Sequence, residues 1–379
     1  MYNKVESEIN RKTVLITGGS GFIGGRLAEL LSLEYDVRVK CLVRDLSKCS
    51  QLARFDTIEI IYGSLTNITA VEVAVSGCDI VFHCAYDASS QKNNLDGINN
   101  LSSSCIKYAA KLVHVSTISV FEPLPDFELT EDSIKEPGGF QYAERKLEIE
   151  RLVIDLAEKT ELSATVIQPT IVYGPFSAPW TMRPVSQLLN GTIVLPDQGE
   201  GLCNAVYVDD VCKAMILAGL NDNSLGETYL ISGAEPVSWS EFFEAFQKSI
   251  NSDSILYMPV FEIKKTLRNP LKLIKTILGD PKKAVDWEPL KSMLISLRYK
   301  IPSSMRTRIK SLYGYYSKYS PSPVYFPNNQ MLELYTSKCT VSIEKARKDL
   351  GYNPDFTFKD GMQLTEQFIH WAFPKDLNI

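Results

Sequence analysis

A glycine-rich segment directly after the first apolar run constrains the fold of this chain more than any other feature. The run Val14–Thr17 leads into Gly18-Gly19-Ser20-Gly21-Phe22-Ile23-Gly24, and the residues from Phe22 onward have helical periodicity. Glycine permits a tight turn from a strand into a helix and lets the backbone approach a phosphate closely. The segment therefore predicts a pyrophosphate-binding turn of a dinucleotide site, with contacts from Gly18, Ser20, Gly21, Phe22, Ile23 and Gly24.

Short β-branched runs alternate with helical patterns over the first 170 residues. The expected strands are 14–17, 37–43, 58–62, 80–82, 112–115 and 164–167, and the expected helices are 22–33, 70–75, 97–110 and 142–158. Such alternation builds βαβ units, whose parallel strands are covered by helices on both faces. The fold class predicted is therefore α/β, with a doubly wound parallel sheet of the Rossmann type.

The chain of 379 residues is longer than one hydrophobic core usually covers. Four prolines punctuate residues 175–196, after which a helical pattern at 205–220 and a strand pattern at 228–232 return. Two more helices are expected at 342–350 and 361–373. We predict a dinucleotide-binding domain over 11–175, to which 203–232 returns, and a smaller C-terminal substrate-binding domain of 176–202 and 233–379.

Residues 252–320 differ in charge from the rest of the chain. They contain 14 Lys and Arg against 5 Asp and Glu, whereas the whole chain has a net charge of −5. Ile263, Leu267 and Leu271 lie at helical spacing among lysines, and Pro270 would kink any single helix here. One interpretation is a basic amphipathic surface for peripheral membrane contact or a phosphorylated substrate. The other is a helix pair that packs on the small domain with a solvated basic rim.

Composition excludes several other classes of function. The net charge of −5 argues against a nucleic-acid partner. The eight cysteines form no C-x-x-C pair and the chain has three histidines, so no metal site is expected. The polar N-terminal residues lack the apolar stretch of a secretory signal, and there is no run of 18 apolar residues. These features predict a cytoplasmic protein.

Arg44 stands at the end of the second predicted strand, where a carboxylate commonly binds the ribose hydroxyls of NAD. A guanidinium there can pair with the 2′-phosphate of NADP. The sequence therefore favours NADP(H), with NAD(H) as the alternative. Arg44 could instead stack on adenine or face solvent, and the neighbouring Asp45 is a second candidate for the ribose.

Tyr142 and Lys146 are spaced by four residues on a predicted helix, which puts both on one face. An ammonium near a phenol favours the phenolate and lowers the pKa of the tyrosine. A tyrosine tuned in this way can transfer a proton near neutral pH.

The segment His114-Val115-Ser116-Thr117 at the end of the fifth strand, followed by Tyr142-x-x-x-Lys146, resembles the extended short-chain dehydrogenase/reductase family. Four further segments match the family in order: Phe82–Tyr86, Asn94-x-x-Gly97, Pro169–Pro175 and Val206–Val211. The resemblance implies that Thr117, rather than its neighbour Ser116, is the catalytic hydroxyl, with Tyr142 as the proton donor or acceptor and Lys146 as its partner. His83 and His114 are interpreted as structural residues.

The same resemblance implies further cofactor contacts and a dimer. The implied contacts are Ser64, Leu65, Ala85, Tyr86, Tyr142, Lys146, Pro169 and Val172, although Ser64 stands where the family usually has an aspartate. The helices predicted at 97–110 and 142–158 look like the pair that forms the dimer interface in this family. The family branch is similar to the NAD-dependent epimerases and dehydratases.

The residues after Thr117 disfavour two of the reactions that members of this family catalyse. Dehydratases and decarboxylases of the family carry acidic residues there, whereas this chain has Ile118 and Ser119. Residues 195–204 resemble a loop that approaches a nucleotide-sugar diphosphate, and 342–352 are similar to the 3β-hydroxysteroid dehydrogenase branch. We expect an NADP-dependent oxidoreductase of a nucleotide-activated sugar. The alternatives are a 4-epimerase, a reductase of a hydrophobic ketone, and a non-catalytic NADP-sensing scaffold.

Overall fold

The computed structural model describes residues 9–268 and 323–374, which form two compact units. Within these residues, the first unit comprises 9–177, 204–236 and 339–361, and the second comprises 178–203, 237–268, 323–338 and 362–374. The sequence analysis assigns all of 233–379 to the second domain, whereas the structure groups 339–361 with the first unit. The Tyr352 hydroxyl donates to the Ser232 carbonyl at 2.8 Å, and Asp210 accepts from the Asp355 amide at 2.7 Å, which fixes this segment there.

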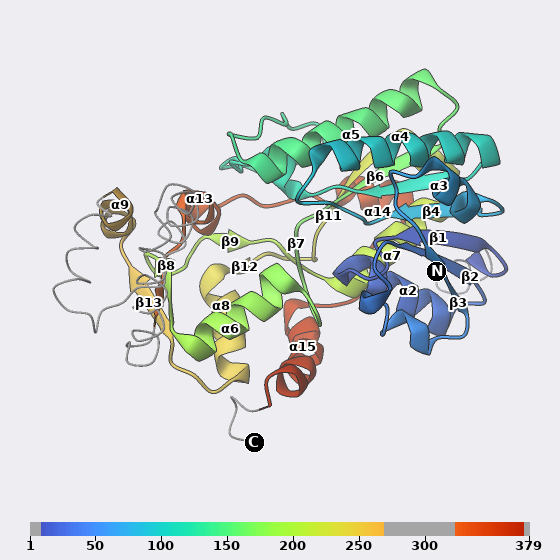
Figure 1. The fold of residues 1–379 in the computed structure, drawn as a ribbon. Coiled ribbons are helices and arrows are strands. Elements are labelled where there is room, and N and C mark those ends of the chain that lie inside the picture. The colour runs from blue at the N-terminus through green and yellow to red at the C-terminus, as the bar shows by residue number, and fades with distance from the viewer. Residues whose placement is uncertain (1–8, 269–322, 375–379) are drawn as a thin grey trace, which may run out of the picture. The chain divides into compact units, whose positions relative to one another are not determined.

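A seven-stranded parallel sheet forms the centre of the first unit (Figure 1). Its strands are β1 (Thr13–Thr17), β2 (Arg38–Val43), β3 (Ile58–Tyr62), β4 (Ile80–His83), β5 (Lys111–Val115), β6 (Ala164–Pro169) and β11 (Thr228–Ile231). The strand order is β11-β6-β5-β4-β1-β2-β3, so the direction of winding reverses between β1 and β4. This topology confirms the predicted doubly wound fold, and each of the six strands expected in the first 170 residues is present.

Helices cover both faces of this sheet (Figure 1). On one face α4 (Gln91–Tyr108) lies between α3 (Ile68–Val75) and α5 (Gln141–Lys159). On the other, α2 (Phe22–Glu34) and α14 (Glu344–Leu350) both contact α7 (Val208–Leu220). Burial on both faces explains why β5 and β6 are buried along their whole length.

Several helix boundaries differ from the sequence-based expectations. Helix α4 begins at Gln91 rather than at residue 97, because the Ser90 side chain accepts a hydrogen bond from the Asn93 amide and caps the helix earlier. The helix expected from residue 205 begins at Val208, because residues 205–207 form a strand instead. Helix α15 (Phe358–Ala372) begins three residues before the expected start.

The chain also contains a short strand pair and five short helical turns within the described residues. In the first unit, β7 (Ile171–Tyr173) pairs with β10 (Ala205–Tyr207). The short helical turns are η1 (Leu46–Lys48), η2 (Leu52–Arg54), η3 (Ile118–Phe121), η4 (Ala178–Met182) and η5 (Asp222–Ser224).

The second unit has its own small sheets and an aromatic core. Its strands are β8 (Thr192–Pro196), β9 (Leu202–Cys203), β12 (Val237–Ser238), β13 (Ile255–Met258) and β14 (Val324–Tyr325), and its helices include α6 (Arg183–Asn190), α8 (Trp239–Ser249), α9 (Val260–Arg268) and α13 (Asn329–Thr336). Ser238 and Glu241 form a capping box at the start of α8. Trp239, Phe242 and Phe246 of this helix are fully buried and supply the core.

Most of the basic segment 252–320 lies outside the described residues. In the described part, Ile263 of α9 is fully buried and packs with Val194 and Leu332 of the same unit. Lys264 and Lys265 on the same helix are exposed. Helix α9 therefore packs on the second unit and exposes its lysines, as the second interpretation of the basic segment expects. The membrane interpretation of residues 269–320 falls on residues that the structure does not describe.

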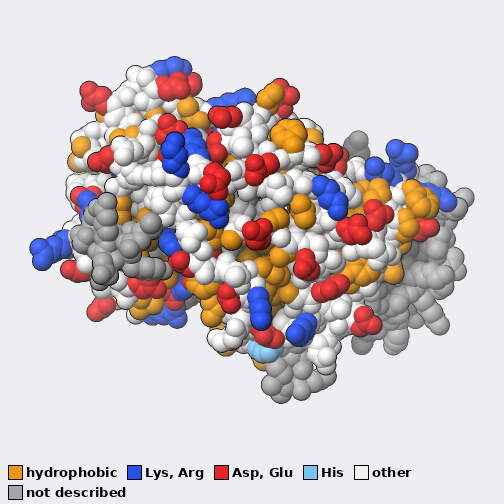
Figure 2. Space-filling view, turned by 180° about the vertical axis from the view of Figure 1, so that it is seen from behind, with side chains coloured by type: hydrophobic (Ala, Val, Ile, Leu, Met, Phe, Trp, Pro, Cys, Tyr) orange, Lys and Arg blue, Asp and Glu red, His pale blue; other side chains and the backbone are white. Residues whose placement is uncertain are grey.

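Acidic and basic side chains are interspersed on the face of the molecule shown in Figure 2. All eight cysteines are free thiols. Within residues 9–268 and 323–374, no helix combines the length and the apolar character that a membrane crossing needs.

Candidate active site

The predicted site residues of the first unit follow the carboxyl ends of parallel strands. Such strands end at one edge of a sheet, and a cleft forms there where the strand order reverses. That reversal lies between β1 and β4. The residues concerned are Gly18 after β1, Arg44 after β2, Ser64 and Leu65 after β3, Ala85 and Tyr86 after β4, Thr117 after β5, and Pro169 at the end of β6.

The glycine loop is shaped by close contacts with its surroundings. Gly18 has a φ of 75°, and a Cβ built on it would lie 2.7 Å from the Ala85 nitrogen. A Cβ on Gly24 would lie 2.5 Å from the Gly18 carbonyl oxygen. Glycine at position 18 therefore lets the loop pack against the chain after β4, and glycine at position 24 lets α2 begin close to the Gly18 carbonyl.

The N-terminus of α2 fits an anionic group. Its N-cap is Gly21, so no side chain caps the helix, and the first turn contains no acidic residue. Ser20 and Gly21 are exposed, and Phe22 and Ile23 are half-buried. Unfilled amide donors and the positive end of the helix dipole suit the pyrophosphate of a dinucleotide.

Arg44 forms an ion pair with Asp87. The Arg44 Nη1 lies 2.8 Å from the Asp87 Oδ2, and the Arg44 side chain is 65% exposed. Asp87 also accepts hydrogen bonds from Ser89 and Asn93, and these bonds together with Arg44 hold the pKa of Asp87 well below its usual range. Because β1 lies between β2 and β4, this ion pair spans the end of β1.

Asp45, the second candidate for the ribose, is engaged locally. Its carboxylate accepts from the Ser47 amide at 3.0 Å and from the Ser47 hydroxyl at 2.6 Å, which caps η1. The Ser64 hydroxyl likewise bonds the Thr66 hydroxyl at 2.8 Å. The Leu65 side chain packs on the core beneath α4.

Tyr142 and Lys146 both contact the ring of Tyr86, and Tyr142 is hydrogen-bonded to Thr117. The Tyr142 ring meets the Tyr86 ring edge to face at 5.4 Å, and the Lys146 Nζ lies 5.6 Å from the Tyr86 centroid. Tyr142 is 46% exposed, whereas Lys146 and Thr117 are buried. The Lys146 ammonium donates to the Val115 carbonyl at 2.7 Å. The helix therefore places a partly exposed tyrosine ring, whose hydroxyl is desolvated, one turn from a buried cation.

The pKa values in this group have identifiable causes. Burial raises the pKa of Tyr142 to about 12, while a hydrogen bond with Thr117 acts in the opposite direction. Burial also lowers the pKa of Lys146 to about 8, while the negative charge of Glu150 opposes that shift. Burial sets the direction of the Tyr142 shift, so the expected lowering of the tyrosine pKa by Lys146 is not found here.

Three carboxylates near the site were missed by the sequence analysis. They are Asp87, Glu122, which accepts from the Ser119 hydroxyl at 2.9 Å, and Glu150, which accepts from the Ser116 hydroxyl. Glu150 follows Lys146 by four residues, a spacing that could have revealed it. The other two lie in irregular segments, where spacing carries no such signal.

The two histidines at the strand ends stack on each other. The ring centroids of His83 and His114 are 5.3 Å apart, and the His83 Nδ1 bonds the Thr17 hydroxyl at 2.6 Å. Burial lowers the pKa of His83 to about 3, so its imidazole is neutral. Among the residues that the structure describes, no cluster of three or more His, Cys, Asp or Glu side chains is arranged to hold a metal ion.

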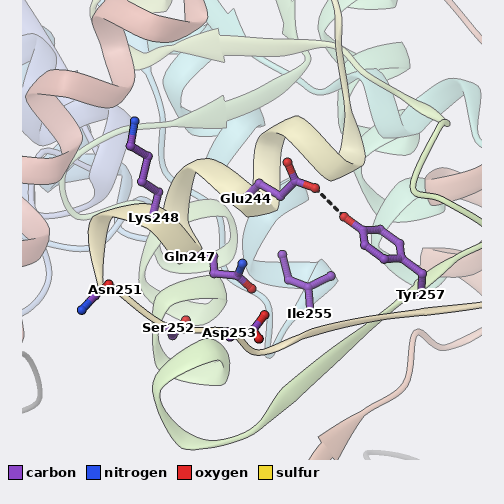
Figure 3. A pocket seen from close by; sticks show the side chains of 8 residues that line it. All are labelled: Glu244, Gln247, Lys248, Asn251, Ser252, Asp253, Ile255 and Tyr257. Atoms are coloured by element: carbon purple, nitrogen blue, oxygen red, sulfur yellow. Dashed lines mark hydrogen bonds between the residues drawn. The ribbon is translucent and has the colours of Figure 1, made fainter.

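Pro169 and Val172 are buried in β6 and β7, respectively. A separate polar pocket of about 390 Å³ lies in the second unit and contains none of the predicted site residues (Figure 3). The Tyr257 hydroxyl donates to Glu244 at 2.6 Å across it. Its lining comes from α8, from the chain between α8 and β13, and from β13 itself.

Comparison with known proteins identifies relatives over much of the chain. The model of the NAD dependent epimerase/dehydratase family matches residues 14–232. A 4-hydroxy-2-methyl-3-oxo-4-farnesyl-3,4-dihydroquinoline-1-oxide ketoreductase of Stigmatella aurantiaca is 26% identical over 238 residues, covering 60% of this chain and 70% of that protein. A 3beta-hydroxysteroid-dehydrogenase/decarboxylase of Arabidopsis thaliana is 22% identical over 388 residues, covering 94% and 79%.

Solved structures share the fold at low identity. A dTDP-glucose 4,6-dehydratase from Bacillus anthracis in complex with NAD matches with a TM-score of 0.67 and 18% identity, covering 96% of this chain and 98% of that one. A UDP-glucose 4-epimerase from Thermotoga maritima with UDP-glucose matches with a TM-score of 0.65 and 19% identity, covering 95% and 99%. At this identity the likeness establishes the architecture.

Proposed function

The chain belongs to the NAD dependent epimerase/dehydratase family, and on that premise we propose that it is an NAD(P)-dependent oxidoreductase that interconverts one carbonyl and one hydroxyl group of its substrate. The observation that carries the proposal is that Tyr142 is hydrogen-bonded to Thr117, while Tyr142 and Lys146 both contact the ring of Tyr86. The uncapped α2 N-terminus and the glycine loop at the same sheet edge fit the cofactor.

Each of the three residues has a proposed task. A bound nicotinamide would accept or supply the hydride. Thr117 donates a hydrogen bond to the substrate oxygen, and Tyr142 gives that oxygen its proton or removes it. Lys146 contributes a fixed positive charge close to this oxygen, which stabilises negative charge that develops there. The 46% exposure of Tyr142 leaves its ring accessible to a substrate.

NADP(H) is the cofactor that we propose, with NAD(H) as the alternative. Arg44 is exposed at the end of β2 and can form charge-assisted hydrogen bonds with a 2′-phosphate. Asp87 competes for the same guanidinium, so a bound 2′-phosphate would have to share or replace that ion pair. The dehydratase that shares this fold was solved in complex with NAD, which supports the alternative.

For the substrate, two classes have support. The sequence analysis favours a nucleotide-activated sugar on the basis of residues 195–204. In the structure, Asp197 of that loop accepts from the Val260 amide, and the Glu200 carbonyl accepts from Lys338. The curated relatives named above include a ketoreductase and a hydroxysteroid dehydrogenase, which favours a hydrophobic ketone. We propose the hydrophobic ketone as the first class to test and the nucleotide sugar as the second.

The segment after Thr117 supports simple oxidoreduction or 4-epimerisation over water elimination. Ile118 is buried, and the Ser119 hydroxyl donates to Glu122. Neither side chain supplies the acid and base that an elimination needs at these positions.

We also propose a homodimer in a cytoplasmic setting. The adjacent helices α4 and α5 form the proposed dimer face, and the eight free thiols are consistent with a reducing compartment. Multi-angle light scattering should give twice the chain mass at micromolar concentration, and a monomer there would contradict the dimer.

A turnover panel with cofactor titration tests the proposed function. The purified full chain is offered NADPH and NADH with long-chain β-ketones, 3-ketosteroids and nucleotide-4-ketosugars, and oxidation of the cofactor is followed at 340 nm. Turnover of a ketone is the expected result. Turnover of nucleotide sugars alone selects the second class. A 4-epimerase causes no net oxidation of the cofactor, so its product is sought separately by chromatography of the nucleotide sugar. Cofactor binding with neither cofactor oxidation nor an epimerised product supports the scaffold alternative.

A further inference from the structure

Glu150 is a buried carboxylate with an unusual set of partners. Its side chain is fully buried on α5, where it accepts hydrogen bonds from three other segments of the chain. The donors are the Ser116 hydroxyl, the Lys135 ammonium at 2.6 Å and the Gln168 amide at 2.9 Å. A buried charge persists only when it is paired and hydrogen-bonded, so this set explains how the carboxylate is tolerated.

The position of Glu150 links it to the proposed site. Tyr142, Lys146 and Glu150 are spaced by four residues and therefore share one face of α5. Lys146 bonds the carbonyl of Val115, and Glu150 bonds the hydroxyl of the next residue, Ser116. One helix thus holds two consecutive residues at the end of β5, directly before Thr117.

We propose that Glu150 is a positioning residue of the active site, which fixes the segment before Thr117 and supplies the negative charge that the buried Lys146 ammonium requires. The proposal rests on the proposed function of Tyr142, Lys146 and Thr117. Glu150 acts through Lys146 and Ser116 and does not itself contact the reacting atoms. Ser116, which the family resemblance leaves as the weaker candidate for the catalytic hydroxyl, is instead the anchor for this contact.

The charges of the groups around Lys146 decide whether losing the Glu150 carboxylate would raise or lower the pKa of Lys146. His83 and His114 of the adjacent strands have lowered pKa values and are neutral, and the pKa of the Cys84 thiol is raised to about 12, so it is neutral as well. The Tyr86 ring lies 5.6 Å from the Lys146 Nζ, and Tyr142 on the same helix has a raised pKa and is a neutral phenol.

Glu150 is therefore the carboxylate that keeps Lys146 protonated, and Lys135 offsets part of its charge. Removing the Glu150 charge lowers the pKa of Lys146 further, so the ammonium is lost at a lower pH. Removing the Lys135 charge leaves the Glu150 charge without that offset, so it should raise the pKa of Lys146.

The test measures the affinity of the full chain for NADPH and NADH by fluorescence titration from pH 6 to 10. In the wild type we expect affinity for the better-bound cofactor to fall as Lys146 deprotonates near pH 8. Glu150→Gln keeps the shape and one acceptor but removes the charge, and it should shift this midpoint down by about 1 pH unit. Lys135→Met should shift it upward. Glu148→Gln removes an exposed charge from the same helix and should leave it unchanged.

The outcomes separate this proposal from the proposed function. If neither cofactor binds the wild type at any pH, the proposed function is wrong. If the wild type binds with the expected midpoint and both Glu150→Gln and Lys135→Met leave it in place, the role of Glu150 is wrong. Should Glu150→Gln fail to fold by circular dichroism, the upward shift in Lys135→Met still decides the question, because a purely structural network gives no shift of opposite sign.

Discussion

Removing Asp87 from its ion pair with Arg44 should increase the preference for NADPH over NADH. Asp87→Asn removes the charge that competes for Arg44 but keeps an acceptor for Ser89. The Arg44 side chain is 65% exposed, so the pair contributes about 0.2–1 kcal/mol. Releasing Arg44 should therefore raise the affinity for NADPH by up to about 5-fold relative to NADH.

Arg44→Ala should act in the opposite direction and more strongly. Hydrogen bonds to a charged group contribute roughly 1.5–3 kcal/mol, which corresponds to about a 10- to 100-fold loss of NADPH affinity. Affinity for NADH should stay within about 2-fold of the wild type, because a ribose diol gains little from a guanidinium. The difference should shrink at high salt, since the site is exposed.

The assay is fluorescence titration of both cofactors against the wild type, Asp87→Asn, Arg44→Ala and Asp45→Asn. Asp45→Asn is included because Asp45 is the second candidate for the ribose, although its oxygens cap η1. Equal affinities for NADPH and NADH in the wild type, with no change of their ratio in Arg44→Ala, would refute the reasoning. A selective loss of NADH affinity in Asp45→Asn would assign the ribose to that residue instead.

Three further changes have expected outcomes. Gly18→Ala places a Cβ 2.7 Å from the Ala85 backbone at a φ of 75°, so cofactor binding should be lost by titration, whereas the exposed turn glycine in Gly226→Ala should retain it despite its similar φ. Burial raises the pKa of Asp210 from 3.8 to about 6, so the folded state binds that proton more tightly and stability rises as the pH falls from 7 to 4. In urea unfolding, the wild type should gain roughly 2 kcal/mol over Asp210→Asn across this window, and parallel pH profiles would contradict it. Lys146→Met should both weaken cofactor binding and lower kcat, because Lys146 is an implied cofactor contact and its charge is proposed to act on the substrate oxygen. A loss confined to one of the two would contradict this pair of assignments.

The sheet could be predicted because its strands are continuous β-branched runs and its first turn has a strict glycine spacing. Burial on both faces imposes those runs, so the pattern survives in the sequence. The start of α4 was predicted six residues late, because residues 91–96 are mostly polar and the Ser90 cap, rather than apolar periodicity, sets the boundary. Capping is a local hydrogen bond that periodicity does not detect.

The parts of the candidate site that could be predicted are those formed by residues close together in the sequence. Tyr142 and Lys146 are neighbours on one helix, so a spacing of four brings them together. The partners of Arg44 and Glu150 come from segments distant in the chain, namely Asp87 after β4 and Lys135 before α5. These pairs form only when the folded chain brings separate segments together, so the sequence spacing does not reveal them. For the same reason, the direction of the Lys146 ammonium toward the Val115 carbonyl could not be anticipated.

The central claim is that the chemistry belongs to Tyr142, and single-turnover kinetics of Tyr142→Phe tests it most directly. The variant keeps the ring contact with Tyr86 and deletes the transferable proton. With a substrate found in the turnover panel, the rate should fall by about 100-fold or more, as expected for the loss of a general acid, while cofactor affinity stays within about 2-fold. A rate above about a tenth of the wild-type value in Tyr142→Phe would contradict the assignment of proton transfer to this helix.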